Sequence, residues 1–374
     1  MNNQIIEKII GNFCDAGRFI SFAPIEAGHI NTTVRVTCEK DGKKINHLLQ
    51  MINTHVFKNP VQLMDNVHAV TSFVKSKVIE NGGDCERETL YCKLTNDGKT
   101  FYVDEENKVW RLYNYVENSF SHNSIDSPEI FSKAGKAFGD FQRLLADFPM
   151  DGLYDTIPDF HNTAKRFNNL RKSIEKNASG RACQVQKEID FAFERREETY
   201  ILVGKQAIGD LPTRVTHNDT KLNNILFDKD TNEPVCIVDL DTVMPGLSVY
   251  DFGDAIRFGA NTAAEDEKDL SKVSLDLNLY EQYVRGFLSS AGASLTAEEV
   301  KCLPLGAKMM TFECGMRFLT DYIDGDVYFR THYPEHNLDR CHTQFTLVYD
   351  MERKFEQMHE ITRKAYKDIC GKEY

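Results

Sequence analysis

The sequence predicts an α+β fold with a small strand-rich part at the N-terminus and a larger, mainly helical part after it. Runs rich in β-branched and aromatic residues crowd the first third of the chain. Apolar residues recur at helical spacing through most of the rest, interrupted by one strand–loop–hairpin pattern within residues 213–241. Because 374 residues exceed the usual size of one hydrophobic core, we expect two domains, residues 1–116 and 117–374.

Composition narrows the class of protein. The formal net charge is −12, which disfavours nucleic acid as a partner because phosphate backbones attract basic surfaces. A nucleotide stays compatible, since a metal ion and a few cations can hold a triphosphate. The ten cysteines form no Cys-x-x-Cys pair, as expected of reduced thiols in a cytosolic protein. The chain begins with an amphipathic helix pattern, and no apolar run is long enough to span a bilayer, so we expect a cytoplasmic protein without a membrane partner. We also expect a monomer, although the sequence does not fix the oligomeric state.

Strand patterns dominate the first domain. Three strands are predicted in order, in the runs FISFAPI from Phe19, TVRVTC from Thr33 and INHLLQM from Ile45. A turn at residues 27–29 separates the first two, as in a hairpin. A further strand pair is expected at residues 99–103 and 109–116, joined by a turn near residues 104–107.

Helical patterns lie between these strands and throughout the second domain. Pro60 favours the first position of a helix, which the Asn-Gly-Gly run at residues 81–83 would end. Its predicted apolar face comprises Val61, Met64, Val67, Val74 and Val78. A core helix is predicted from the repeat Phe131, Ala134, Phe138, Phe141, Leu145 and Phe148. Further helices are expected at residues 185–203 and through the last hundred residues.

One stretch carries a recognisable chemistry. His217 and Asp219 are separated by one residue, and Asn224 follows Asp219 by five, which is the spacing of a kinase catalytic loop. Phosphoryl transfer requires a carboxylate that orients the acceptor hydroxyl and a neutral oxygen ligand for magnesium on the same loop. Asp219 suits the first role and Asn224 the second, while Lys221 could neutralise charge on the transferring group. The alternative is a capped loop in an unrelated α/β domain.

A predicted hairpin continues from this loop. Two apolar arms, at residues 225–227 and 235–238, flank a polar turn and lead directly to Asp239. A strand that ends in an aspartate would return a carboxylate to the metal beside Asn224, and magnesium would complete its shell with ATP oxygens and water. Asp241 is a candidate supporting group, or a ligand of a second magnesium ion.

Two other features compete with this assignment or extend it. Asp251 begins an Asp-Phe-Gly triplet like the metal-binding triplet of protein kinases, but it lies 32 residues after Asp219 and does not end the hairpin strand. We therefore assign the metal to Asp239 and expect Asp251 to cap a helix. His217 is expected to brace the loop from a buried position rather than to act in catalysis. Residues 113–116 end the first domain and either bind adenine through the backbone or are simply a strand end.

The turn after the first strand is a weaker candidate. Its backbone N–H groups could cover the phosphates of ATP, and an ordinary hairpin turn is the alternative. The candidate residues there are Gly28, His29, Asn31 and Thr32.

Residues 214–226 resemble the signature of the aminoglycoside phosphotransferase and choline kinase superfamily. More narrowly, the chain resembles the bacterial N-acetylhexosamine 1-kinases. The matching stretches cover nearly the full length: GHINTT from Gly28, FGDFQ from Phe138, THNDTKLNNIL from Thr216, DFGDAIRFGA from Asp251, EDEKDLSKV from Glu265, ECGMRFL from Glu313 and YPEHNL from Tyr333.

The resemblance implies a protein-kinase-like two-lobe fold and phosphorylation of the anomeric O1 hydroxyl of N-acetylglucosamine and N-acetylgalactosamine by ATP and Mg²⁺. It implies that Asp219 is the base, that Asn224 and Asp239 hold magnesium, and that Lys221 contacts phosphate. His29 would lie near the cleft between the lobes. The acceptor sugar would be bound by Arg317 and Tyr328. From the residues alone, Arg317 is a surface or ion-pair residue, and Tyr328 is a core residue.

One departure keeps other functions open. The third strand of kinases usually carries a lysine that holds phosphates, and this chain offers Gln50 there. Another small-molecule kinase would act on choline, which prefers an aromatic cage, on homoserine, or on an aminoglycoside, which prefers acidic clusters. A non-catalytic nucleotide-binding pseudokinase is a different class, motivated by Gln50. A protein kinase is disfavoured because no Ala-Pro-Glu segment follows Asp239.

Overall fold

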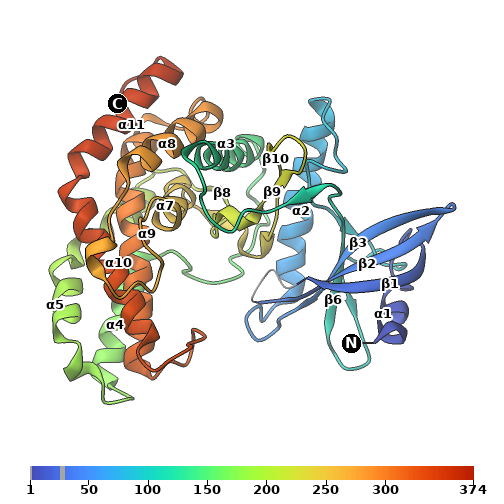
Figure 1. Ribbon diagram of the computed structural model, residues 1–374, viewed down its shortest axis with the longest axis horizontal. Helices are drawn as coiled ribbons and strands as arrows, with labels where there is room; N and C mark the ends of the chain where they lie inside the picture. Colours follow the sequence, from blue (N-terminus) through green and yellow to red (C-terminus); the bar gives the residue numbers. More distant parts are fainter. Residues whose placement is uncertain (1, 26–29) are drawn as a thin grey trace. The chain divides into compact units, whose positions relative to one another are not determined.

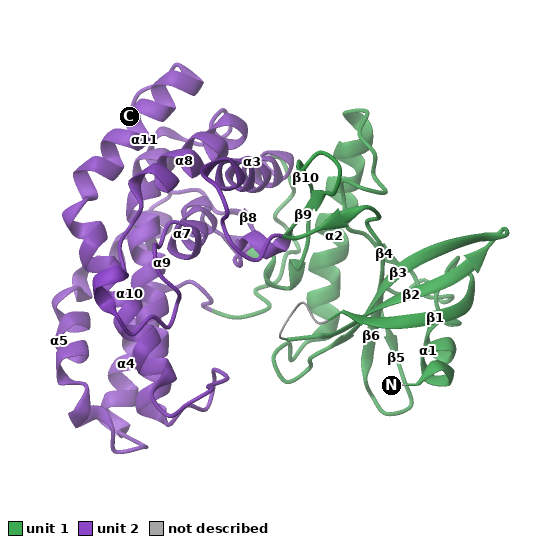
Figure 2. Ribbon diagram, in the orientation of Figure 1, with its two compact units in different colours: residues 1–121, 147–158, 225–244 green, residues 122–146, 159–224, 245–374 purple. Residues whose placement is uncertain are grey.

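The computed structural model describes residues 2–25 and 30–374 and divides into two compact units (Figure 1, Figure 2). Unit 1 comprises residues 1–121, 147–158 and 225–244, and unit 2 comprises residues 122–146, 159–224 and 245–374. The predicted order, strands first and helices after, is confirmed. Two segments from later in the chain return to unit 1, which the sequence did not indicate. No helix within the described ranges is long and apolar enough to cross a membrane.

The main sheet of unit 1 is antiparallel, with the order β1-β2-β3-β6-β4 and β5 also paired to β6. Its strands are β1 (Arg18–Ile25), β2 (Thr32–Lys40), β3 (Lys43–Ile52), β4 (Cys92–Lys93), β5 (Tyr102–Val103) and β6 (Val109–Asn114). The three N-terminal strands and the later pair are therefore confirmed. The register places Gln50 of β3 opposite Thr33 on one side and Arg111 on the other.

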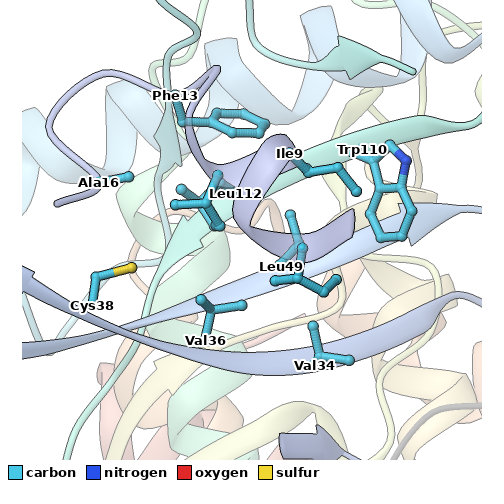
Figure 3. Close-up of a cluster of buried hydrophobic side chains, with 11 residues drawn as sticks. Ile9, Phe13, Ala16, Val34, Val36, Cys38, Leu49, Trp110 and Leu112 are labelled. Carbon is cyan, nitrogen blue, oxygen red and sulfur yellow. The ribbon is translucent and has the colours of Figure 1, made fainter. Parts of the chain in front are cut away.

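A short helix covers one face of this sheet. The predicted amphipathic helix is α1 (Asn3–Ile10), which buries Ile6, Ile9 and Ile10. These side chains join a cluster with sheet residues that include Leu49 and Trp110 (Figure 3). Burial of apolar surface between α1 and the sheet stabilises their packing by about 25 cal/mol per Å² removed from water.

The helix that Pro60 predicts is α2 (Pro60–Glu80), which Asn59 caps and which ends at Asn81. Four members of its predicted face are buried, but Val61 is 51% exposed. That part of the prediction is wrong because Leu63 and Val70 extend the buried face to the side away from Val61.

Asn66 of α2 ties both returning segments to unit 1. Its side-chain nitrogen donates to the carbonyl oxygens of Tyr154 at 2.8 Å and of Val243 at 3.0 Å, and its side-chain oxygen accepts the Tyr154 N–H at 2.9 Å. The second sheet of unit 1 has the order β10-β9-β7 and combines β7 (Ser119–Phe120) with the predicted hairpin, β9 (Ile225–Asp228) and β10 (Pro234–Ile237).

Unit 2 is mainly helical, as predicted. Its helices are α3 (Pro128–Leu144), α4 (Thr163–Lys176), α5 (Gln186–Glu194), α6 (Ile201–Ala207), α7 (Ser248–Gly259), α8 (Leu277–Ala291), α9 (Ala297–Asp324), α10 (His336–Arg353) and α11 (Phe355–Cys370). The strand β8 (Arg214–Thr216) precedes the loop with Asp219, and β11 (Met244–Gly246) precedes α7.

The helix predicted from residue 131 onward ends earlier than its apolar repeat. Phe148 lies beyond the end of α3, in unit 1, and packs edge-on against Phe73 with ring centroids 5.1 Å apart. The prediction fails at this end because Phe148 precedes Pro149, and a residue before proline disfavours the helical conformation.

Candidate active site

The structure brings three of the predicted residues together in the loop of residues 217–224 of unit 2, which we call the catalytic loop. The Lys221 Nζ lies 2.7 Å from the Asp219 Oδ1. The Asn224 Nδ2 donates to the Asp219 backbone oxygen at 2.8 Å and to Asp219 Oδ2 at 3.2 Å. These bonds use the amide nitrogen of Asn224, and its amide oxygen is the atom type that magnesium binds. A carboxylate, a cation and an amide oxygen are thus available within a single turn of chain.

Lys221 is held as a cation. Burial alone would lower the pKa of Lys221, but the carboxylates of Asp219 and Asp254 outweigh it and raise the pKa above its ordinary value. Asp254 lies on α7 and is itself paired with Arg257. Lys221 therefore carries its charge at neutral pH and can balance the negative charge of a phosphoryl group.

Asp251 holds the backbone of the catalytic loop. Its Oδ2 accepts the N–H of His217 at 2.9 Å, and its Oδ1 accepts the N–H of Asn218 at 2.7 Å. Gln142 of α3 also donates to Oδ2, at 3.0 Å. Burial raises the pKa of Asp251, although these backbone N–H donors and the Gln142 amide oppose the rise.

The expectation that Asp251 caps a helix is therefore wrong. Asp251 lies inside the first turn of α7, whose N-cap is Leu247 without a side-chain cap bond. The carboxylate bonds to a loop more than thirty residues earlier, and local sequence preference does not reveal such a distant partner. The assignment of magnesium to Asp239 rather than Asp251 stays a prediction.

His217 has the buried environment that a loop-bracing residue requires. It has no exposed surface, and its ring lies edge-on against Phe138 at 5.6 Å and Phe141 at 5.9 Å. Its Nδ1 accepts the backbone N–H of Asp219 at 3.3 Å. The ring thus contacts the loop rather than facing solvent.

Asp239 and Asp241 lie in unit 1, around a turn of 3₁₀ helix, η4 (Leu240–Thr242). Asp239 has a φ of 61°, in the left-handed region that residues with a side chain rarely adopt. Asp241 is buried, and both of its carboxylate oxygens are bonded: Oδ1 by Arg111 NH1 at 2.5 Å and Oδ2 by Asn31 Nδ2 at 2.6 Å. In this arrangement, Asp241 supports the turn after Asp239. Among the described residues, no three His, Cys, Asp or Glu side chains gather as a metal-binding group.

Arg111 is the residue of this region that the sequence did not reveal. It is 1% exposed, and its Nε and NH2 donate to Gln50 Oε1 at 3.0 and 2.8 Å. Burial alone would lower the pKa of Arg111, but Asp241 and Tyr113 more than reverse this, so the pKa is raised. A buried guanidinium thus lies beside Gln50, the third-strand position at which we expect a lysine in a kinase. Only the register between β3 and β6 could have pointed to it.

The structure describes only part of the turn that is predicted to bind phosphate. Gly28 and His29 lie outside the described residues. Thr32 opens β2, and Asn31 precedes it. The Asn31 side chain links Asp241 to the backbone N–H of Asn53, which its oxygen accepts at 3.0 Å. A role of these residues in phosphate binding stays a prediction.

The two residues predicted to bind the acceptor sugar lie in unit 2. The Arg317 guanidinium of α9 stands over the rings of Phe160 at 5.6 Å and Phe329 at 5.4 Å. Tyr328 is 68% exposed, so the interpretation of Tyr328 as a core residue is wrong. Asp321 fixes the loop that carries Tyr328, because its carboxylate accepts the N–H groups of residues 327, 328 and 329 at 2.8–2.9 Å.

Comparison with known proteins identifies the fold and the family. A choline kinase from Cryptosporidium parvum Iowa II is 14% identical with a TM-score of 0.58, covering 95% of this chain and 97% of that chain. A spectinomycin phosphotransferase in complex with ADP and spectinomycin is 12% identical with a TM-score of 0.55, covering 96% and 99%. An amicoumacin kinase in complex with AMP-PNP and Ca²⁺ is 11% identical with a TM-score of 0.59, covering 92% and 93%.

These likenesses confirm the predicted kinase-like α+β fold, in which an antiparallel sheet precedes a mostly helical part. The model of the phosphotransferase enzyme family matches residues 21–283, which include the catalytic loop, the hairpin and Asp251. With more than half of its length matched, the chain belongs to the phosphotransferase enzyme family.

Proposed function

We propose that this phosphotransferase is an N-acetylhexosamine 1-kinase. It transfers the γ-phosphoryl group of ATP to the anomeric O1 hydroxyl of N-acetylglucosamine or N-acetylgalactosamine, giving the sugar 1-phosphate and ADP. The observation that carries the proposal is the contact of Asp219 with both Lys221 and Asn224 in the catalytic loop. The resemblance of the matching stretches to N-acetylhexosamine 1-kinases supports the choice of acceptor.

Asp219 accepts the proton of the acceptor hydroxyl as O1 attacks the phosphorus. An anomeric hydroxyl is more acidic than an ordinary alcohol, so a carboxylate is an adequate base. Lys221, charged and 2.7 Å from Asp219, neutralises charge on the transferring group. Most of the acceleration in such reactions comes from positioning and charge neutralisation.

Asn224 and Asp239 would hold magnesium, which neutralises phosphate charge when bound. The amide oxygen of Asn224 and the carboxylate of Asp239 are the oxygen donors that this ion prefers. The amicoumacin kinase contains AMP-PNP with Ca²⁺, and the spectinomycin phosphotransferase contains ADP, which supports ATP as the co-substrate and a divalent cation as the cofactor here. In this proposal residues 1–116 bind the nucleotide, and residues 117–374 carry catalysis and the acceptor.

Arg317 and Tyr328 are proposed to bind the sugar. The guanidinium of Arg317 carries several N–H donors in a fixed plane, and two aromatic rings hold that plane in place. The exposed ring of Tyr328 offers an apolar face and a hydroxyl, a combination that suits a sugar ring with its hydroxyl groups.

The test is turnover with a panel of acceptors, with ADP release and the phosphorylated product both measured. The panel contains the two N-acetylhexosamines, glucose, choline, homoserine, kanamycin and spectinomycin. We expect the N-acetylhexosamines to be phosphorylated at O1. Turnover of choline, homoserine or an antibiotic instead would leave the family in place and contradict the sugar. Nucleotide binding without turnover of any acceptor would favour the pseudokinase.

Asp219→Asn isolates the base. We expect its kcat to fall by about 10²- to 10⁴-fold, the usual contribution of a general base, while ATP still binds with an affinity near that of the wild type. Asp151→Asn is the matched control, because Asp151 is an exposed aspartate outside the catalytic loop, and its kcat should not change. Full turnover by Asp219→Asn would remove Asp219 from the reaction.

A further inference from the structure

His161 links the backbone of the catalytic loop to helix α9, and the reaction as proposed assigns it no role. It lies just before α4 in unit 2 and is 7% exposed. Its Nε2 is 3.2 Å from the backbone oxygen of Asn218, the residue that precedes Asp219. Its Nδ1 is 3.0 Å from Glu313 Oε1 on α9.

Both partners of the ring are hydrogen-bond acceptors. A carbonyl oxygen and a carboxylate oxygen each need an N–H from the ring, and a neutral imidazole has only one. With both ring nitrogens facing acceptors, the two bonds together need one proton more than a neutral imidazole carries. Three other charged groups surround the pair of His161 and Glu313. The Nε of Arg166 on α4 is 3.9 Å from Glu313 Oε1. Asp254 of α7 and Arg317 of α9 interact electrostatically with His161 and Glu313, respectively.

The contact with Asn218 matters because of the conformation of that residue. Asn218 has a φ of 63°, in the left-handed region, which asparagine adopts more readily than most residues with a side chain. Asp251 accepts the N–H of Asn218 at 2.7 Å, and His161 donates to its carbonyl oxygen. The two contacts hold the peptide groups on both sides of Asn218, and Asp219 projects from the second.

Glu313 anchors His161 from the helix that carries Arg317. Glu313 has no exposed surface, and its Oε2 has no hydrogen-bond partner among the described residues. A buried carboxylate with one oxygen unsatisfied costs free energy, and the bond from His161 offsets part of that cost at the other oxygen. Glu313 precedes Arg317 by one helical turn, so α9 bears both the proposed sugar contact and the anchor of His161.

We propose that His161, anchored by Glu313, is a positioning residue for the reaction: its bond to the Asn218 carbonyl fixes the peptide from which Asp219 projects. The proposal rests on the assignment of Asp219 as the base. It assigns His161 no contact with substrate, and its effect is on kcat rather than on nucleotide binding.

Two isosteric substitutions separate the two bonds. In His161→Gln the side-chain nitrogen replaces Nε2 and keeps the bond to Asn218, whereas in His161→Asn it replaces Nδ1 and keeps only the bond to Glu313. We expect kcat to fall by about 10- to 100-fold in His161→Asn, the effect of misplacing a reacting group by about 1 Å. In His161→Gln we expect a loss of less than about 3-fold. The KM for ATP should stay unchanged in both.

Glu313 provides a second test that does not require a substitution of His161. The amide of Glu313→Gln can still bond Nδ1, so kcat should stay close to that of the wild type. Glu313→Leu cannot, but it leaves Nε2 able to bond Asn218, so its kcat should fall no further than that of His161→Gln. The double variant His161→Asn/Glu313→Leu should be no slower than His161→Asn, because the bond to Asn218 is already lost in that single variant.

His342 provides the matched control. It forms another histidine–glutamate pair in unit 2, with Nε2 2.8 Å from Glu188 Oε1, and His342→Asn should leave kcat unchanged. Equal losses in His161→Gln and His161→Asn, or no loss in either, would overturn the proposal. The readout uses whichever acceptor the wild-type enzyme phosphorylates. If the acceptor is not the proposed sugar, the His161 variants can still be compared. Full turnover by Asp219→Asn, in contrast, would contradict both the assignment of Asp219 as the base and the role of His161.

Discussion

Arg111 neutralises the carboxylate that follows the proposed metal ligand. It bonds Asp241 and Gln50 from a position with 1% exposure, and Asn31 bonds the other oxygen of Asp241. The geometry is that of a buried ion pair with most of its polar atoms satisfied. Loss of one partner from such a pair is far more damaging than loss of both.

Arg111→Met should lower the free energy of unfolding by about 3–5 kcal/mol, because it leaves the Asp241 carboxylate buried without its cation. Arg111→Met/Asp241→Asn should recover about 1–3 kcal/mol of that loss. The measurement is urea unfolding of the full chain. Arg18→Met, which breaks the exposed pair with Glu39, is the control, with a change of about 0.5 kcal/mol or less. Additive losses in the double variant would show that the pair is not coupled.

At this scale, the sequence predicted the residues whose spacing is local. Asp219, Lys221 and Asn224 lie within six residues, and the structure brings them into contact. The sequence missed Arg111 and His161 because their partners lie 130 and 152 positions away. A charged residue within a strand pattern, or a lone histidine before a helix, carries no local sign of such a partner.

Helices α7 and α9 approach each other through glycines, and this contact supports the catalytic loop. A Cβ at Gly253 would lie 2.4 Å from the backbone oxygen of Gly306, and a Cβ at Gly306 would lie 2.4 Å from that of Val249. Gly253 is flanked on α7 by Asp251 and Asp254, which bond the loop backbone. A displacement of α7 away from α9 would therefore also displace the backbone of the catalytic loop.

Gly253→Ala should lower the free energy of unfolding by about 1–3 kcal/mol, because the added methyl group meets a backbone oxygen that cannot move independently of α9. It should also lower kcat, since Asp251 moves with α7. Gly204→Ala is the control: Gly204 is in α6 with nothing within 4 Å of the added Cβ, so stability should rise by up to about 1 kcal/mol. Thermal unfolding and turnover are measured on all three proteins. A Gly253→Ala enzyme as stable as the wild type would contradict the close contact.

Elements with a strong period were predicted, and errors occurred where tertiary packing decides. Val61 follows the helical period of α2 and still faces solvent, because neighbouring residues provide the buried face. The apolar repeat of α3 runs past its end, where Pro149 stops the helix and Phe148 packs in unit 1. Periodicity shows that a face is apolar, not which part of the molecule covers it.

At the scale of the molecule, unit 1 is assembled from three separate segments. Residues 225–244 supply β9, which pairs with β7, and they supply Asp241, which neutralises Arg111. Residues 147–158 supply Tyr154, whose backbone bonds Asn66. The N-terminal segment alone would retain buried polar groups without these partners.

A fragment of residues 1–121 should therefore not fold as a stable unit. We expect it to show no cooperative thermal transition by circular dichroism, because Asn66 loses its backbone partners, Arg111 loses the carboxylate of Asp241 and β7 loses its partner strand. The full chain is the reference under the same conditions. A fragment that unfolds cooperatively at the temperature of the full chain would contradict this prediction.

The length of the chain and its strand and helix patterns predicted two parts, strands first, but not their discontinuity. These patterns change near residue 117, yet segments that cross from one unit to the other leave no mark in them. The sequence of β9 and β10 predicts a hairpin equally well in either unit. Their packing partner depends on long-range contacts that a one-dimensional pattern does not contain.

The pairing of Gln50 with Arg111 also bears on how such chains are sorted. A screen that accepts only sequences with a basic third strand would discard this chain, although the adjacent strand holds a guanidinium in register with that position. Positive charge is better counted over two paired strands than along one strand. A screen of the third strand alone will wrongly exclude chains of this kind.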